Sequence, residues 1–448
     1  MPLDDRPCCA DFPQQLGGDQ VRLPPRSLLG RFQTPGQSDA ILDWLEEQAP
    51  SAAGAIIALD MIAWGGLVAS RLPDKDPQAA QARLQRLMDI PDLKILAFQT
   101  IMRNAPTQRT PEEVHWAEAI TRLSQATARG DDKLCQELRS QIPAELLERY
   151  LEARACNAKI YRFLANNSQR FDYLVFALDD SKTAGWNLLE LRQLGAFENL
   201  PGTDETALLL LARAHAEVRQ VQLCFSHPDL AGLQGLYEDR PLDQVLQAQM
   251  RAANLQSVES SPRQLWLYGR PGALQEEARQ QQPFCVNPAW LESLGSALDR
   301  GGQVVLVDLT FANGGDLSLG QALADRGLWS RLRGYAAWNT LGNRLGTALA
   351  NLVLPLSTRQ SQEFLSDRVL DDLLYQADFR WSAAAMLGHS GLTLAEGESR
   401  RVHEETFPEL LRACRQLVPG LRLDVDLDLP WQRLFELAIK RPLESAKA

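Results

Sequence analysis

The chain has 448 residues, of which 45% are hydrophobic and 23% are charged, and its formal net charge is −11 at pH 7. This composition is typical of a folded globular protein and excludes a mainly disordered chain. The acidic balance argues against a nucleic-acid or anionic-membrane partner, because either would need a basic surface. No run approaches the roughly 18 apolar residues of a membrane-spanning helix. Charged residues follow Met1 where a signal peptide would be apolar, so we expect a cytoplasmic protein.

Short apolar runs recur along the chain, and each ends in polar or glycine-rich sequence. We expect strands, in chain order, at Pro2–Leu3, Ala55–Leu59, Lys94–Phe98, Tyr173–Leu178, Val221–Phe225, Gln264–Tyr268, Val304–Val307 and Gly334–Ala337. Stretches with helical period lie between them, for example Pro77–Met88, Pro111–Ala128 and Glu205–Val218. Nearly all-apolar strands that alternate with helices predict a parallel sheet covered on both faces.

Eight such strands are the number that closes a (β/α)8 barrel, so the predicted fold class is α/β with a TIM-barrel-like parallel barrel. An open doubly wound parallel sheet is the alternative, because periodicity does not show closure. We expect residues 1–352 to form the barrel-like domain, with a helical insertion at about residues 100–170. Residues 353–448 would form a C-terminal appendage of helices and one half-exposed strand, Leu421–Leu427. The sequence predicts no oligomeric state.

Adjacent Asp179 and Asp180, directly after a predicted strand, are the sharpest chemical feature of the sequence. In a parallel α/β fold, ligands bind at the carboxyl ends of the strands, where Asp60 and Asp308 also lie. Two close carboxylates split their pKa values, which gives one proton donor and one anion for work on a glycosidic bond. The same carboxylates suit a hard divalent cation. One Asp capping the next helix, with the other solvated, is the purely structural interpretation.

Two further segments follow predicted strands. Trp338 offers a face for a sugar ring, and the Asn339 and Asn343 amides can orient hydroxyl groups, although the same residues suit a strand-to-helix turn. The segment from Asn313 to Asp316 lets backbone amides approach a ligand but lacks the sequence of a nucleotide-binding loop. Arginines near strand ends can bind a carboxylate or phosphate with both arms of the guanidinium, and they are Arg6, Arg71 and Arg103.

Six motifs occur along the chain in a fixed order. They are PLDDRP at residues 2–7, GGLVASR at 65–71, Asp179–Asp180, GTDETALLLLAR at 202–213, NGGD at 313–316 and WNTLGNRLGTALA at 338–350. In these motifs the sequence resembles the bacterial domain of unknown function 4127 family over almost its entire length. The resemblance implies no settled activity, but it singles out Asp4, Asp5, Arg6, Arg71, Asp179, Asp180, Asp204, Glu205, Asp308, Asn313, Asp316, Trp338, Asn339 and Asn343. Family members carry a short apolar strand before the first motif, whereas here Met1 directly precedes it.

The leading functional hypothesis is a glycoside hydrolase that acts on a small carbohydrate or amino-sugar glycoside and needs no cofactor. The paired Asp is similar to that of substrate-assisted barrel glycosidases, in which one Asp orients the 2-acetamido group and its neighbour protonates the leaving oxygen. On this hypothesis Asp180 is the general acid and Asp179 its partner. The remaining candidates would bind substrate: Asp4, Asp5, Arg6, Asp60, Arg71, Asp308, Asn313, Asp316, Trp338, Asn339 and Asn343.

Two alternatives stay open from the sequence. The first is a divalent-metal-dependent hydrolase or isomerase, in which Mg²⁺ or Mn²⁺ would be held by Asp60, Asp179, Asp180 and Asp308. The second is a non-catalytic sugar-binding protein, which would be stabilised by its ligand without turnover.

Overall fold

The computed structural model describes residues 1–107, 111–215, 219–272 and 275–441. The chain divides into two compact units. The first contains Met1–Gln14, Asp19–Ala214 and Tyr237–Arg240, and the second contains Gln15–Gly18, His215–Leu236 and Pro241–Ala448. The expected boundary at residue 352 lies within the second unit, so a separate C-terminal appendage stays a prediction.

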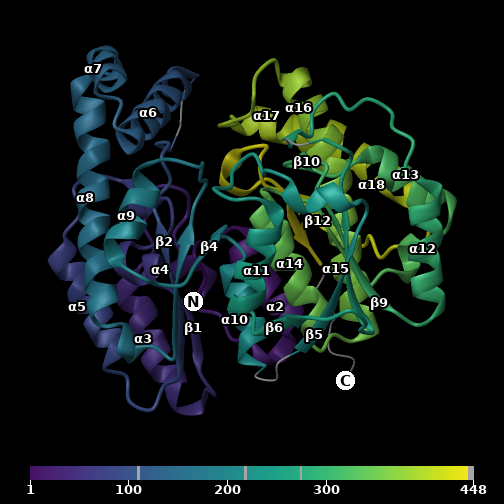
Figure 1. Cartoon of the computed structure of the whole chain (residues 1–448), viewed down its shortest axis with the longest axis horizontal. Coiled ribbons are helices and arrows are strands. Elements are labelled where there is room, and N and C mark those ends of the chain that lie inside the picture. The colour runs from purple at the N-terminus through teal and green to yellow at the C-terminus, as the bar shows by residue number, and fades with distance from the viewer. Residues whose placement is uncertain (108–110, 216–218, 273–274, 442–448) are drawn as a thin grey trace. The chain divides into compact units, whose positions relative to one another are not determined.

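The first unit is built on a four-stranded parallel sheet with the order β1-β2-β3-β4 (Figure 1). Its strands are β1 (Ala55–Ala58), β2 (Ile95–Ile101), β3 (Tyr173–Leu178) and β4 (Asn199–Pro201). Its helices are α1 (Pro7–Ala10), α3 (Ser38–Gln48), α4 (Leu59–Trp64), α5 (Pro77–Met88), α6 (Pro111–Arg129), α7 (Asp132–Gln141), α8 (Ala144–Asn166), α9 (Trp186–Leu194) and α10 (Thr206–Ala214), while α2 (Phe12–Gly17) contains residues of both units.

Burial explains the apolar sequence of these strands. Every residue of β2 is buried, as a central strand of a sheet covered on both faces requires. Figure 1 shows α3, α5 and α8 on one side of the sheet, whereas α10 lies on the other and contacts β1 and β2. The Met1 backbone lies along the free edge of β1, where its amine donates to the Ile56 carbonyl and its carbonyl accepts from the Ala58 amide.

The second unit contains a five-stranded parallel sheet with the order β11-β9-β7-β5-β6. Its strands are β5 (Arg219–Phe225), β6 (Leu255–Ser257), β7 (Arg263–Tyr268), β9 (Gln303–Asp308) and β11 (Gly334–Ala336). Counted along the chain, this is the strand order 2-1-3-4-5 of a common doubly wound fold. Two small sheets accompany it, the parallel pair β8 (Glu276–Glu277) and β10 (Phe311–Ala312) and the antiparallel pair β12 (Asp426–Asp428) and β13 (Ala438–Lys440).

Helices cover both faces of this second sheet. They are α11 (Leu242–Ala252), α12 (Pro288–Asp299), α13 (Leu317–Asp325), α14 (Leu341–Val353), α15 (Thr358–Arg368), α16 (Arg380–Leu387), α17 (Glu396–Arg401) and α18 (Phe407–Leu417), with a π-helical segment at Val369–Phe379. Trp266, Leu306 and Tyr335 pack into one apolar core with α12 and the π-helical segment. Alternate strand residues point the opposite way, toward the face that α14 contacts.

The predicted α/β class with parallel sheets is confirmed. The strands expected from the sequence pair into the two larger sheets, and no pairing among the described residues closes either of them into a barrel. Seven of the eight expected strands form, whereas Pro2–Leu3 forms none; the Leu3 side chain is buried, and its carbonyl accepts from the Leu67 amide. The expected strand Leu421–Leu427 is reduced to β12 at its end.

The expected helices at residues 77–88 and 111–128 are confirmed, and residues 100–170 are mainly helical through α6, α7 and α8. The helix expected at Glu205–Val218 ends at Ala214, and residues 216–218 lie outside the described part of the chain. Within the described residues, no helix has the length and apolar character needed to cross a membrane.

Gly65 provides a test of this fold. It ends α4 with φ +79°, and a Cβ built on it would lie 2.5 Å from the Gly36 amide nitrogen. We expect Gly65→Ala to lower the free energy of unfolding by about 3 kcal/mol, combining left-handed strain with a backbone clash. Gly130→Ala is the control, because Gly130 has φ +73° with no atom within 4 Å of an added Cβ. Urea unfolding of Gly130→Ala should show a free energy of unfolding only about 1 kcal/mol lower. Equal losses in the two variants would contradict the close approach of Gly65 to Gly36.

Candidate functional site

Polar side chains gather at the carboxyl ends of the strands in the first unit. Asp60 follows β1, Arg103 follows β2, and Asp179 and Asp180 follow β3. Thr203, Asp204 and Glu205 follow β4 in the same way. Since the four strands are parallel, all these residues meet at one edge of the sheet, where α/β proteins bind ligands.

Arg6 joins the N-terminal segment to this edge. Its guanidinium donates to Asp4 at 2.8 Å and to both carboxylate oxygens of Asp204 at 2.7 and 3.0 Å. All three side chains are buried. Such a bidentate, charge-assisted arrangement is among the strongest polar contacts in proteins. Asp4 and Arg6, which we expected to bind substrate, therefore bond each other, while Asp5 is half-buried and its carbonyl accepts from Arg26.

Each Asp of the pair after β3 has its own arginine partner. Arg71 donates to Asp179 Oδ2, and Arg103 donates to Asp180 Oδ2 at 2.9 Å. The two carboxyl groups differ in exposure, because the Asp179 side chain is 9% exposed and that of Asp180 is 33% exposed. Asp180 also has φ +32°, an unfavourable backbone conformation of the kind that clusters at functional sites.

The buried charges in this cluster perturb one another. Burial raises the pKa of Asp179, Arg71 opposes that rise, and the neighbouring Asp180 charge adds to it. Burial also lowers the pKa of Arg71, as does the like charge of Arg103. The Arg71 Nε is buried and has no hydrogen-bond partner among the described residues. A buried donor without an acceptor is costly, so a ligand oxygen at this position would stabilise the site.

Asp60 holds the ends of two strands together. Its carboxylate accepts from the Gln99 side chain at 2.8 Å and from the Thr100 amide at 2.9 Å. The Thr100 hydroxyl in turn contacts that of Thr203 at 2.8 Å, which links β2 to the segment after β4. Burial raises the pKa of Asp60 to about 6, although these hydrogen bonds oppose the rise.

A second polar cluster lies at the carboxyl ends of β7, β9 and β11 in the second unit. Asp308 accepts from the Asp316 and Thr310 amides and from the Tyr335 hydroxyl. Asp316 caps α13 and accepts two hydrogen bonds of 2.7 Å from Arg270. Burial and the Asp316 charge raise the pKa of Asp308 to about 6.

Asn313 and Asn339 have left-handed backbones, with φ +53° and +64°. The Asn313 amide donates to the Asn339 carbonyl at 3.0 Å, and its side-chain nitrogen donates to Glu277 at 2.8 Å. The Asn313 Oδ1 is buried without a partner among the described residues. It is one of several buried acceptors of this unit that a ligand donor could satisfy.

Trp338 and Asn343 are buried. The Trp338 ring packs against Phe435 with a centroid distance of 6.1 Å, and its amide donates to Asp372. Asn343 lies in the first turn of α14, where its amide donates to the Thr340 cap. A ring that is 7% exposed offers little face to a sugar, so Trp338 stabilises the end of β11.

The sequence-predicted residues thus fall into two groups, one in each unit. Asp4, Asp5, Arg6, Asp60, Arg71, Asp179 and Asp180 lie in the first unit, and Asp308, Asn313, Asp316, Trp338, Asn339 and Asn343 lie in the second. Sequence reasoning singled out Glu205 in a family motif but gave it no role at the site; burial and the Asp204 charge raise its pKa well above the usual value. Sequence reasoning missed Arg368 and Asp372, which pair at 2.7 Å in the second unit, although their i, i+4 spacing was a visible signal.

Protein donors already bond three of the four alternative metal ligands. Arg71 and Arg103 bond Asp179 and Asp180, and donors already occupy the Asp60 carboxylate. Among the described residues, no group of three or more His, Cys, Asp or Glu side chains has a geometry that could hold a metal ion.

Comparison with known proteins places the chain in a family. The family model described as "Protein of unknown function (DUF4127)" matches residues 1–440, so the chain belongs to that family. No curated protein and no solved structure was found to match the sequence.

The buried Asp60 makes a testable contribution to stability. Because its pKa rises from 3.8 to about 6 on folding, the folded state favours the proton, and the stabilisation is lost as the pH rises from about 4 to 6. We expect the unfolding free energy of the wild type, relative to Asp60→Asn, to fall by about 3 kcal/mol over this range. Denaturant unfolding at several pH values measures it. The substitution Asp92→Asn, at an exposed position, is the control. A difference in unfolding free energy between wild type and Asp60→Asn that does not change with pH would refute the raised pKa of Asp60.

Proposed function

We propose that this member of the DUF4127 family is a hydrolase that acts on the glycosidic bond of a small polar carbohydrate at the carboxyl edge of its first sheet. The observation that carries the proposal is that adjacent Asp179 and Asp180 lie in unlike environments. Pairs of carboxyl groups whose surroundings favour different protonation states are typical of glycosidase acid–base sites. Asp179 is buried with a raised pKa, whereas Asp180 is a third exposed and bonded to Arg103.

These environments reverse the roles that we expected from the sequence. Asp179 is the group that burial favours in the protonated form, so we assign it as the general acid. Arg71 donates to its Oδ2, which leaves Oδ1 to carry the proton. Asp179 would protonate the leaving oxygen as the glycosidic bond breaks. The Asp180 carboxylate would stabilise the positive charge that develops at the anomeric carbon. Water would then add to that carbon and give one proton to the Asp179 carboxylate, which restores the acid.

The polarity of the site supports a hydroxyl-rich ligand. The Arg71 Nε is a buried donor without a partner among the described residues, and a ring hydroxyl or the carbonyl of an acetamido group would satisfy it. Asp60 is fully buried and bonded to Gln99 and Thr100, so we assign it to holding the strand ends in position rather than to substrate contact. Arg6, with Asp4 and Asp204, anchors the same edge.

The second unit supports the alternative of sugar binding without turnover. Its Asn313 Oδ1 is a buried acceptor without a partner among the described residues, next to the strained Asn339. Binding there predicts a ligand-induced rise in melting temperature that Asn313→Ala removes and Asp179→Asn leaves unchanged. Thermal shift with sugars, amino sugars, Mg²⁺ and Mn²⁺, each with and without EDTA, separates this alternative from the metal-dependent one.

Aryl glycosides of sugars and N-acetyl amino sugars test the catalytic roles. We expect Asp179→Asn to lower kcat/KM at least about 100-fold on nitrophenyl substrates but far less on dinitrophenyl substrates, whose leaving group needs no proton. Asp180→Asn should lower activity on both. Wild-type activity should fall as the pH rises through the raised pKa of Asp179, and Asp179→Asn should lack this alkaline limb.

Asp92→Asn, an exposed substitution away from this edge, is the matched control, and thermal unfolding of each variant reports whether it is folded. Equal loss by Asp179→Asn on both classes of leaving group would contradict the acid role. Hydrolysis of none of these glycosides by the folded wild type would overturn the proposed activity.

A further inference from the structure

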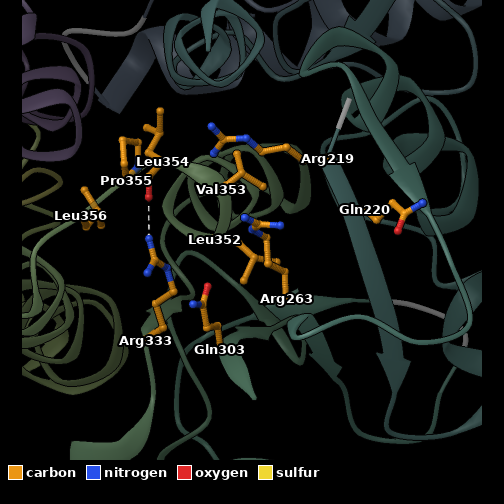
Figure 2. A pocket seen from close by; sticks show the side chains of 10 residues that line it. All are labelled: Arg219, Gln220, Arg263, Gln303, Arg333, Leu352, Val353, Leu354, Pro355 and Leu356. Atoms are coloured by element: carbon orange, nitrogen blue, oxygen red, sulfur yellow. Dashed lines mark hydrogen bonds between the residues drawn. The ribbon is translucent and has the colours of Figure 1, made fainter. Parts of the chain in front are cut away.

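The second unit contains a cavity of about 490 Å³ at the amino ends of its strands, the opposite edge of the sheet from the polar cluster around Asp308 (Figure 2). Three arginines line it, Arg219, Arg263 and Arg333, together with two glutamines, Gln220 and Gln303. The segment from Leu352 to Leu356, where α14 ends, completes the lining. No acidic side chain is among these lining residues, although the whole chain carries a net charge of −11.

Strand register sets these side chains in a row. Arg263 is the first residue of β7 and pairs with Gln303, the first residue of β9. The Arg333 amide, just before β11, donates to the Val304 carbonyl at 2.8 Å on the other side of β9. Arg219 and Gln220 begin β5, which pairs with β7. Neighbouring strands lie about 4.8 Å apart, so the long side chains of Arg219, Arg263 and Arg333 reach one cavity, whereas Gln220, adjacent to Arg219 in β5, points away from them (Figure 2).

Capping of α14 accounts for one of the three arginines. Arg333 donates to the Asn351 carbonyl at 2.9 Å and to the Leu354 carbonyl at 2.6 Å, as cations near helix C-termini commonly do. Figure 2 shows the second of these bonds at the edge of the cavity. These two bonds fix the Arg333 guanidinium in place. They do not explain why Arg263 and Arg219 are brought to the same cavity.

Placing the three arginines around one cavity has an electrostatic cost. Burial lowers the pKa of Arg333, and the charges of Arg263 and Arg219 lower it further, so the three groups repel one another. No carboxylate is among the residues that line the cavity beside Arg263 and Arg333. An anionic ligand would offset the repulsion and would gain charge-assisted hydrogen bonds from the guanidinium groups.

We propose that this cavity binds a small phosphorylated molecule through its phosphate group. A phosphate offers several oxygens to the paired N–H donors of guanidinium groups, which match its geometry. The Gln303 amide adds an uncharged donor to the lining, whereas the Gln220 side chain points away from the arginines (Figure 2). The volume exceeds that of one phosphate ion, which leaves room for the organic part of the ligand. The site lies in the second unit and is independent of the hydrolase proposed for the first.

Calorimetric titration of the full chain tests the proposal, with inorganic phosphate, a hexose 6-phosphate and succinate as probes at constant ionic strength. We expect phosphate and the hexose phosphate to bind, the latter more tightly, and succinate to bind at least tenfold more weakly. Arg263→Gln should weaken phosphate binding at least tenfold, and Arg263→Glu should abolish it. Arg400→Gln is the matched control, because that side chain is 66% exposed on α17 and should leave binding unchanged.

The melting temperature of Arg263→Gln distinguishes a ligand-binding role of Arg263 from a structural role. In phosphate-free buffer Arg263→Gln should keep or raise the melting temperature, because it relieves repulsion, while the phosphate-induced rise seen in the wild type should disappear. A clear fall in melting temperature would identify Arg263 as a structural residue and overturn the proposal. So would an equal response of wild type and Arg263→Gln to phosphate, or equal binding of succinate and phosphate.

Discussion

The bonds of Arg6 with Asp4 and Asp204 are the contact on which the candidate site of the first unit depends. They join residues 198 positions apart and are shielded from solvent, so each carboxylate needs the Arg6 guanidinium to compensate its charge. Removing one member of such a buried group leaves an uncompensated charge, which costs more than the group contributes when intact. The same constraint extends along the edge, where each buried or half-buried Asp has an Arg, amide or hydroxyl partner. The site is therefore a network whose members hold one another in place.

Much of this organisation was predictable from the sequence. Apolar runs located the main strands, because residues buried on both faces must be apolar. The rule that ligands bind at strand carboxyl ends correctly placed Asp60 and Asp179 at one edge of a sheet. Closure was not predictable, because a local pattern does not specify which strands pair. The short edge strands β4 and β6 escaped notice, since Asn199–Pro201 and Leu255–Ser257 carry no apolar run.

The chemistry of individual side chains was harder to predict than their position. Trp338 follows a strand as expected, but its ring packs on Phe435 inside the unit, and no sequence pattern distinguishes that from an exposed sugar platform. Asp179 and Asp180 have the same side chain and adjacent positions, so the sequence offered no physical reason to prefer either as the acid. The protonation of Asp179 depends on burial and on Arg71, which lies 108 residues away, while Asp180 pairs with Arg103, 77 residues away.

The arginines at two sheet edges of this acidic protein have different surroundings. At the carboxyl edge of the first sheet, buried arginines are matched by carboxylates, so their positions are explained without a ligand. At the amino edge of the second sheet, three arginines share a cavity whose lining contains no carboxylate. Matched charges keep a site ordered when it is empty, whereas like charges around a cavity destabilise the empty form and favour the occupied one. An anion bound there would therefore both fill the cavity and stabilise the unit, because binding to the folded state alone raises its stability.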